Sequence, residues 1–267
     1  SNAPADLHVI LATRHPIHGA GITTWRARGE LCEIDRVDLA FQPGEIDTLF
    51  RETYGVGLAI EEREALADRT EGWPIALQLV WQGMRSSGAR SAAELLVRGQ
   101  ATGSLSALFD FLATEVLGRQ PAEIVDFLLD TAGLRELTPP ACDAATGRSD
   151  AATLIGRLLD HDLFVIALGD QHYRYHHLFH DFLRTQLVAQ PERARACAER
   201  AAVYFNRQGD PDEAIYHWIA AGCFEEVAEA VELAGESFLR LGRLDTVASW
   251  VDALPAGLVA DHPALQQ

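Results

Sequence analysis

Histidine residues are concentrated in the segment 172–180, where their side chains could bind a metal ion or donate hydrogen bonds to a phosphate. They are His172, His176, His177 and His180. A zinc site needs a complete tetrahedral ligand set, and only Asp181 lies near enough in sequence to add to them. No metal site is therefore predicted. An imidazole can also donate to a phosphate oxygen. His176 lies between the expected hairpin and the last helix, where it could instead be a helix cap packed at a domain boundary.

Two other positions carry groups that suit a phosphate or a planar ring. Residues 7–14 form a short apolar run that predicts a buried strand. Arg14 ends this strand at its carboxyl end, where the ligands of α/β proteins gather, and its guanidinium could bind a phosphate through two hydrogen bonds. The alternative is a surface arginine. Gly72-Trp73-Pro74 predicts the start of a helix with a rigid apolar corner, or a simple helix start with Trp73 in the core.

The chain contains no lysine, because all 22 of its basic residues are arginine. A phosphate-binding P-loop uses a lysine to reach the β- and γ-phosphates, and Schiff-base catalysis also needs a lysine amine. A Gly-x-Ser-x-Gly turn and a convincing Ser/His/Asp or Cys/His set are absent from the sequence as well. We therefore predict that the chain is not an enzyme and is not a complete ATPase.

The charge and the cysteine pattern further limit the class of protein to which the chain can belong. A net charge of −17 argues against contact with a phosphate backbone, which basic surfaces bind. The sequence shows no apolar run of the roughly 18 to 20 residues that a membrane span needs, and no signal peptide. The four cysteines form no Cys-x-x-Cys pair, as expected of reduced thiols in a cytoplasmic protein. These features predict a cytoplasmic localisation without nucleic-acid or membrane contact by this segment.

The first part of the chain predicts the edge of an α/β domain followed by helices. Residues 1–3 match the remnant of a cleaved expression tag, and residues 4–40 contain the strand at 7–14, a helix at 22–28 and a strand at 30–35. We expect the rest of this sheet to lie upstream of the chain. Residues 41–119 are then expected to form a helical lid, punctuated by glycines. Its predicted helices cover residues 43–53, 59–69, 72–86, 91–98 and 104–118.

Residues 120–189 have the pattern of a winged-helix domain. Residues 163–168 and 172–176 are apolar or aromatic runs on either side of a Gly-Asp-Gln turn, which predicts a β-hairpin. A further helix is expected from His177. The three helices expected before the hairpin cover residues 121–131, 138–146 and 150–161. The third of these helices carries Arg157 among aspartates, so DNA binding by this domain is not expected.

Residues 190–267 contain an internal repeat with a period of 33 residues. A shift by this period places similar small, aromatic and acidic residues at equivalent positions. The matched pairs are Ala201 and Ala234, Phe205 and Phe238, Gly209 and Gly242, and Asp212 and Asp245. Such a period is typical of helical hairpins of the tetratricopeptide (TPR) kind. Only two repeats fit, so we expect the start of a longer repeat domain.

Five segments, taken in order, resemble a known family. They are Thr13-Arg14, residues 26–31, residues 72–79, residues 173–179, and residues 212–217 with 220–222. The chain resembles the MalT-like, LuxR-type ATP-dependent transcriptional regulators of the STAND class of signal-transduction ATPases. The resemblance implies a mainly α internal fragment that contains a small α/β remnant, a helical lid, a winged-helix domain and TPR-like helical hairpins. The P-loop and the DNA-binding domain of the family are not in this chain.

The resemblance also implies roles for the candidate residues. Arg14 corresponds to a sensor of the γ-phosphate, and Trp73-Pro74 to the corner that lies against the adenine. His176 matches the histidine that contacts the β-phosphate of ADP. Because Tyr175 and His177 replace the methionine and aspartate that flank it in the family motif, the contact is either His176 or His177. ATP or ADP is thus the expected cofactor of the full-length protein, and none is expected to bind this chain alone.

The function that follows is a regulatory switch. In the family, the bound nucleotide controls whether the protein self-associates in response to an inducer, which is a small molecule or a protein. The expected partners of this segment are the upstream nucleotide-binding domain and the downstream repeat and DNA-binding domains of its own chain. The alternative is a helical-repeat interaction scaffold that binds a peptide or another subunit and has no nucleotide function.

Overall fold

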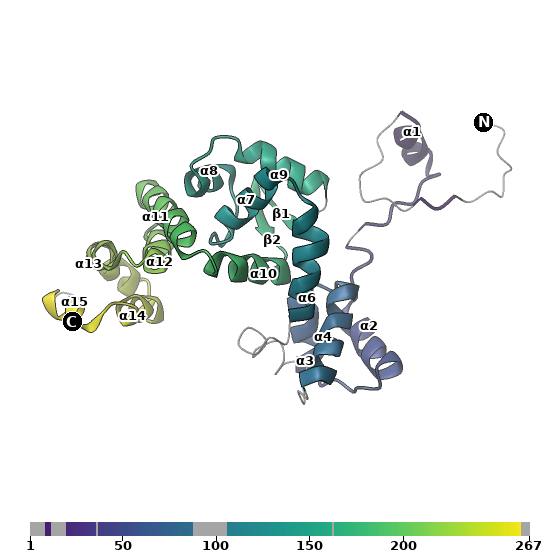
Figure 1. Cartoon of the computed structure of the whole chain (residues 1–267), viewed down its shortest axis with the longest axis horizontal. Helices are drawn as coiled ribbons and strands as arrows, with labels where there is room; N and C mark the ends of the chain where they lie inside the picture. Colours follow the sequence, from purple (N-terminus) through teal and green to yellow (C-terminus); the bar gives the residue numbers. More distant parts are fainter. Residues whose placement is uncertain (1–8, 12–19, 36, 88–105, 162, 263–267) are drawn as a thin grey trace. The chain divides into compact units, whose positions relative to one another are not determined.

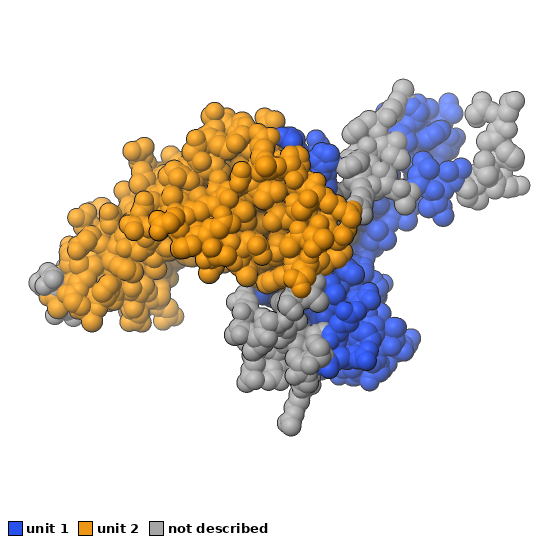
Figure 2. Space-filling model, in the orientation of Figure 1, with its two compact units in different colours: residues 1–108, 156–165 blue, residues 109–155, 166–267 orange. Residues whose placement is uncertain are grey.

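The structure of the chain is a computed structural model, and it divides into two compact units (Figures 1 and 2). It describes residues 9–11, 20–35, 37–87, 106–161 and 163–262. Unit 1 contains residues 1–108 and 156–165, and unit 2 contains residues 109–155 and 166–267. Each unit is described here by itself.

Unit 1 is built from short helices whose starts are set by local capping. The helices are α1 (Ala20–Arg28), α2 (Pro43–Thr48), α3 (Ile60–Thr70) and α4 (Pro74–Ser87), and a π-helical turn over Leu49–Thr53 extends α2. The Glu45 carboxylate accepts a hydrogen bond from the Gln42 N–H at 2.9 Å, and Glu62 does the same for Ala59 at 3.0 Å. These bonds satisfy donors that a helix start leaves unpaired.

The helix predictions for this region are confirmed wherever the structure describes it. The predicted helices at 22–28, 43–53, 59–69 and 72–86 correspond to α1, α2 with its π-helical turn, α3 and α4. The predicted helix at 91–98 lies outside the described residues. The predicted helix at 104–118 is observed from Ser106 as α6 (Ser106–Phe111), a π-helical turn over Leu112–Val116 and a 3₁₀ turn over Leu117–Arg119.

The prediction of a strand at 30–35 is wrong, because these residues have no regular secondary structure. Of the strand predicted at 7–14, only residues 9–11 are described, and they are not a strand either. Ile10 is 95% exposed and Ile34 is 66% exposed. A strand is held by hydrogen bonds to a neighbouring strand, and the sheet of the described residues contains only β1 and β2. Apolar content alone therefore does not make these segments strands.

Residues 122–188 contain the predicted winged-helix pattern. Three helices, α7 (Ala122–Thr131), α8 (Pro139–Thr146) and α9 (Ala151–Asp160), come before the hairpin of β1 (Val165–Gly169) and β2 (His172–Tyr175), and α10 (His177–Val188) follows it (Figure 1). Asp170 and Gln171 at the hairpin turn both have positive φ, 47° and 61°. That conformation suits a tight two-residue hairpin turn. An antiparallel bridge between Leu137 and Tyr173 ties β2 to the segment before α8.

The C-terminal helices form antiparallel hairpins and confirm the internal repeat. They are α11 (Pro191–Gln208), α12 (Pro211–Ala221), α13 (Phe224–Arg240), α14 (Leu244–Asp252) and α15 (Ala256–Asp261). Gly209 and Gly242, which the 33-residue shift pairs, follow α11 and α13 with φ values of 75° and 77°. Glycine adopts this left-handed conformation at a helix end without steric cost.

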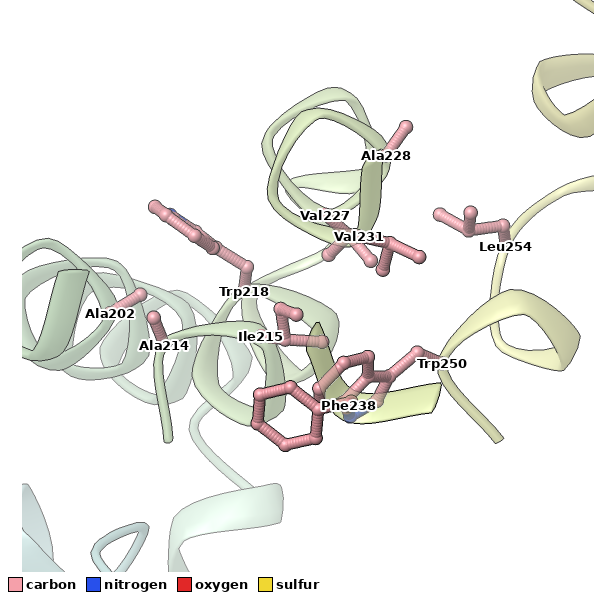
Figure 3. Close-up of a cluster of buried hydrophobic side chains, with 10 residues drawn as sticks. All are labelled: Ala202, Ala214, Ile215, Trp218, Val227, Ala228, Val231, Phe238, Trp250 and Leu254. Carbon is pink, nitrogen blue, oxygen red and sulfur yellow. The ribbon is translucent and has the colours of Figure 1, made fainter. Parts of the chain in front are cut away.

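The two repeats also place equivalent rings together. Phe205 of α11 stacks on His217 of α12 with ring centroids 5.5 Å apart, and Phe238 of α13 packs on Trp250 of α14 at 4.8 Å. Phe238 and Trp250 lie with Ile215 in one buried apolar cluster (Figure 3). The assignment of these hairpins to the TPR family remains an expectation.

Candidate functional site

The corner between α3 and α4 is shaped by a glycine at a position with no room for a Cβ atom. Glu71 and Gly72 both have positive φ, 48° and 68°, and the Gly72 carbonyl accepts a hydrogen bond from the Phe41 N–H at 2.9 Å. A Cβ atom on Gly72 would lie 2.5 Å from the Phe41 carbonyl oxygen. The chain before α2 therefore lies directly against this corner and fixes where α4 begins.

Trp73 and Pro74 stand at the start of α4, as predicted. The Trp73 N–H donates to the Thr70 carbonyl at 2.9 Å, and its carbonyl accepts from the Leu77 N–H at 3.1 Å. The half-buried Trp73 ring meets the Phe164 ring edge to face, with centroids 4.9 Å apart, while Pro74 is exposed. An aromatic ring beside an exposed proline is an apolar surface on which a planar ligand ring could pack.

An open hollow of about 500 Å³ lies beside this corner, on α2. It is lined by Phe41, Thr48 and Leu49 together with Glu45 and Glu52. Two carboxylates repel a phosphate, and the lining offers no cationic side chain against that repulsion. The hollow is therefore unsuited to the phosphates of a nucleotide.

His176 and His177 lie at the beginning of α10, but in different surroundings. His176 is the N-cap, only 2% exposed, and its carbonyl accepts from the His180 N–H at 2.8 Å. His177 is the first helical residue and is exposed. The first turn of α10 carries no acidic side chain, so its positive helix end is not opposed by a neighbouring carboxylate there. Of the two imidazoles, His177 is the one that a ligand in solvent can reach.

The other two histidines of the segment contact different groups. His180 Nε2 lies 2.8 Å from the Ala132 carbonyl oxygen, and burial lowers the pKa of His180. His172 on the hairpin lies 3.2 Å from a Glu136 carboxylate oxygen. Within the part of the chain that the structure describes, no three His, Cys, Asp or Glu side chains are placed to hold a metal ion.

The predicted site residues fall in different parts of the chain. Arg14 lies outside the described residues. Trp73 and Pro74 belong to unit 1, and His176 and His177 belong to unit 2. That these side chains meet around a nucleotide therefore remains a prediction.

Sequence reasoning missed a polar cluster in unit 2 where α12 meets the preceding helices. Arg135, between α7 and α8, donates to a Glu213 carboxylate oxygen at 2.9 Å, and its guanidinium lies 3.9 Å from the centroid of the Tyr216 ring. Arg184 of α10 donates to the Tyr216 hydroxyl. These residues are far apart in sequence, and no local pattern marks them as partners.

His217 lies inside this cluster. It is 1% exposed, and its Nε2 makes no hydrogen bond within the described structure; the nearest Glu213 carboxylate oxygen is 3.7 Å away. Burial, with a smaller contribution from the positive charges of Arg135 and Arg184, lowers the pKa of His217 to about 4. His217 is therefore neutral at neutral pH.

Comparison with known proteins shows what this chain is similar to. The family model described as the MalT winged helix domain matches residues 113–195. The chain is 28% identical to the HTH-type transcriptional regulator MalT of Vibrio parahaemolyticus over 265 residues, covering 98% of this chain and 29% of that protein. A Klebsiella pneumoniae MalT is also 28% identical, with the same coverage of both chains.

A differently named relative matches as well. The serine/threonine-protein kinase PknK of Mycobacterium tuberculosis is 28% identical over 252 residues, covering 92% of this chain and 22% of the kinase. The chain thus spans less than a third of the length of the relatives it matches. The chain is therefore similar to MalT regulators over nearly all of its length, and its residues 113–195 match the MalT winged helix domain.

Proposed function

We propose that this chain is the switch segment of a MalT-like ATP-dependent transcriptional regulator. In this role it supplies lid and sensor contacts to a nucleotide whose phosphates are held mainly by a P-loop outside the chain. The observation that carries the proposal is the continuous similarity to MalT regulators across 98% of the chain. The absence of lysine from the chain is consistent with a P-loop located elsewhere.

The residues present suit such a nucleotide in part. The exposed imidazole of His177, at a helix start without acidic neighbours in its first turn, can donate a hydrogen bond to a phosphate oxygen. His176 is the buried N-cap residue of α10 and is less accessible to a ligand than His177. Trp73 and Pro74 provide an apolar corner for the base. A bound ATP or ADP would supply the phosphate charge that these groups sense, and Arg14 is the proposed γ-phosphate sensor.

The range of relatives favours a regulatory role over a catalytic one. The same segment occurs in proteins named as transcriptional regulators and in one named as a protein kinase. A kinase site needs a lysine that pairs with the phosphates, and this chain has none. What the relatives share over this segment is therefore best explained as a control module, and we propose that the chain is not itself an enzyme.

The proposed switch role also implies the partners of this segment. We propose that the segment contacts the nucleotide-binding domain, the repeat domain and the DNA-binding domain of its own chain, and that an inducer promotes self-association. Its net charge of −17 disfavours direct contact with nucleic acid, and we propose a cytoplasmic location. In the described residues, no helix has both the length and the apolar character of a membrane span.

The alternative function is a helical-repeat scaffold that binds a peptide or another subunit. The observation that favours it is the set of exposed leucines on α13 and near the start of α14. Leu233 is 89% exposed, Leu241 75% and Leu244 65%. Large exposed apolar side chains can contribute to a protein interaction site.

ADP release from the intact parent protein tests the proposal. His177→Ala is expected to speed ADP release roughly 10-fold or more, because a hydrogen bond to a charged group contributes about 1.5–3 kcal/mol. His172→Ala, on the hairpin, is the control and should leave the rate unchanged. Equal release rates for the wild type and His177→Ala would remove His177 from the site, and a parent without bound nucleotide would favour the scaffold.

Calorimetry on the present chain gives a second test. Because the phosphate-binding lysine lies elsewhere in the proposed model, ATP and ADP should bind this chain weakly or not at all. A micromolar dissociation constant would contradict the proposal.

A further inference from the structure

Helix α11 presents two faces, and both are buried against other helices of unit 2. Arg193, Cys197 and Arg200 are spaced by four and three residues and therefore share one face. Ala198, Ala202 and Phe205 have the same spacing and share another. Cys197, Ala198 and Ala202 are all buried, and α11 packs against α7 and α8 as well as α12.

The first face of α11 is tied to the winged-helix domain by directional bonds. Arg193 donates from Nε to the Asp130 carboxylate at 2.6 Å and from Nη2 to Asp126 at 3.0 Å, so it holds two carboxylates of α7. Arg200 donates from Nε to the Ala145 carbonyl in the last turn of α8 at 2.8 Å. The Cys197 thiol lies between them, 3.4 Å from Asp130. Because the Arg193 and Asp130 side chains are only 23% and 19% exposed, solvent screens this pair less than a surface pair.

The second face of α11 is tied to α12. Ala202 belongs to the same buried cluster as Ala214 and Ile215 of α12 (Figure 3). Phe205 stacks on His217 with ring planes only 3° apart. Small alanine side chains let two helices approach closely, so α11 and α12 form one packed hairpin.

Helix α12 also contacts the winged-helix domain directly, through the polar cluster of Arg135, Arg184, Glu213 and Tyr216. The residues at the equivalent positions of the second repeat are different. The 33-residue shift pairs Glu213 with Thr246, Tyr216 with Ser249 and His217 with Trp250. At these positions the first hairpin therefore carries an acid and a phenol that contact arginines, and the second hairpin carries neither. The first hairpin is thus specialised for contact with the winged-helix domain.

We propose that the winged-helix domain and the first helical hairpin form one cooperative body, with α11 as the helix they share. The short link at Gln190, between α10 and α11, then does not act as a hinge. When the winged-helix domain is displaced, α12 therefore moves with it, whichever nucleotide or partner causes the displacement. This inference stands on the contacts of unit 2 and does not depend on the proposed nucleotide function.

Hydrogen exchange of the whole chain, with and without a substitution in α12, tests the proposal. Ile215 is fully buried, and Ile215→Ala should raise the exchange rate of the slowest α12 amides on the order of 100-fold. In a cooperative body, the slowest amides of α7 accelerate by the same factor. If Ile215→Ala does not fold, Ile215→Val gives the same comparison with a smaller change, about 5-fold.

A matched pair of variants tests whether the polar cluster, rather than any lost surface ion pair, couples amide exchange in α12 to that in α7. Arg135→Ala removes the bond to Glu213 and the contact with Tyr216, so in that background Ile215→Ala should accelerate α7 less than α12. Arg240→Ala is the control, because Arg240 pairs with Glu236 on the surface, where both side chains are 76% exposed, and it should leave the coupling intact. Acceleration of α12 while the slowest α7 amides keep their wild-type rate would overturn the proposal.

Discussion

Acid should weaken unit 2 through His217. This side chain is 1% exposed and is faced by Arg135 from the α7–α8 segment, Arg184 from α10, Glu213 and Tyr216 on its own helix, and the Phe205 ring from α11. Two of these neighbours are positively charged and one is a carboxylate. A protonated imidazole would therefore be buried beside two guanidinium groups, with one carboxylate oxygen 3.7 Å away to offset them.

The size of the effect follows from the pKa of His217. It falls from 6.5 to about 4 in the folded chain, mainly because burial disfavours the charged ring. Between these values the unfolded chain binds more protons than the folded one. The free energy of unfolding therefore rises as pH increases across this window and falls as pH decreases through it. A difference of ~2.5 pKa values corresponds to about 3 kcal/mol in total, of which about 2 kcal/mol is lost between pH 7 and pH 5.

Urea unfolding of the wild type and of His217→Phe at pH 5, 6 and 7 measures this effect. Phenylalanine keeps an aromatic ring against Phe205, as Trp250 does against Phe238 in the second repeat, but it does not titrate. Relative to this variant, the wild type should lose about 2 kcal/mol of stability from pH 7 to pH 5. His172→Phe, at an exposed hairpin position, is the control and should run nearly parallel to the wild type. Parallel curves for the wild type and His217→Phe would refute the reasoning.

Three substitutions test local features by urea or thermal unfolding. Gly72→Ala should destabilise the chain by more than ~2 kcal/mol, because its Cβ would collide with backbone atoms. Gly55 has nearly the same φ but open space around it, so Gly55→Ala should cost only about 1–2 kcal/mol. Equal losses for the two variants would contradict the contact with Phe41. Thr138→Ala removes the N-cap of α8 and should cost about 1 kcal/mol, while Thr138→Ser should restore most of it. Tyr175→Phe should cost about 1 kcal/mol, because it removes the buried bond to Thr131 but leaves Thr131 bonded to the Phe127 carbonyl; no loss would mean that this bond is not formed.

Local sequence signals were sufficient for most of the helices and for the hairpin. Pro43 and Pro139 mark helix starts, Gly209 marks a helix end, and Asp170 sits in the hairpin turn. Each of these signals acts within a few residues, through a fixed φ, a missing N–H or a permitted left-handed conformation. The 33-residue period added the two hairpins, because a repeat constrains long-range packing from sequence alone.

Features that depend on distant partners could not be predicted in this way. Residues 30–35 have strand-like composition, but a strand needs a neighbour that composition does not reveal. Phe164 was placed in the predicted strand at 163–168, yet its φ of 56° keeps it out of β1, and its ring lies against Trp73. Arg135 and Glu213 are 78 positions apart, so neither residue predicts the other.

The histidines illustrate why residue type alone does not reveal a side chain's surroundings. The four histidines at 172–180 have separate surroundings, and of the two predicted phosphate contacts only His177 is exposed, so its contact with a phosphate stays a prediction. His217, by contrast, is isolated in sequence and occupies the position that a tryptophan fills one repeat later. This repeat position carries an ionisable ring in place of an apolar one, and it lies where the first helical hairpin meets Arg135 and Arg184 of the preceding segment. Where two hairpins of one chain are related by a sequence period, a residue that departs from the period therefore points to a contact outside the repeat.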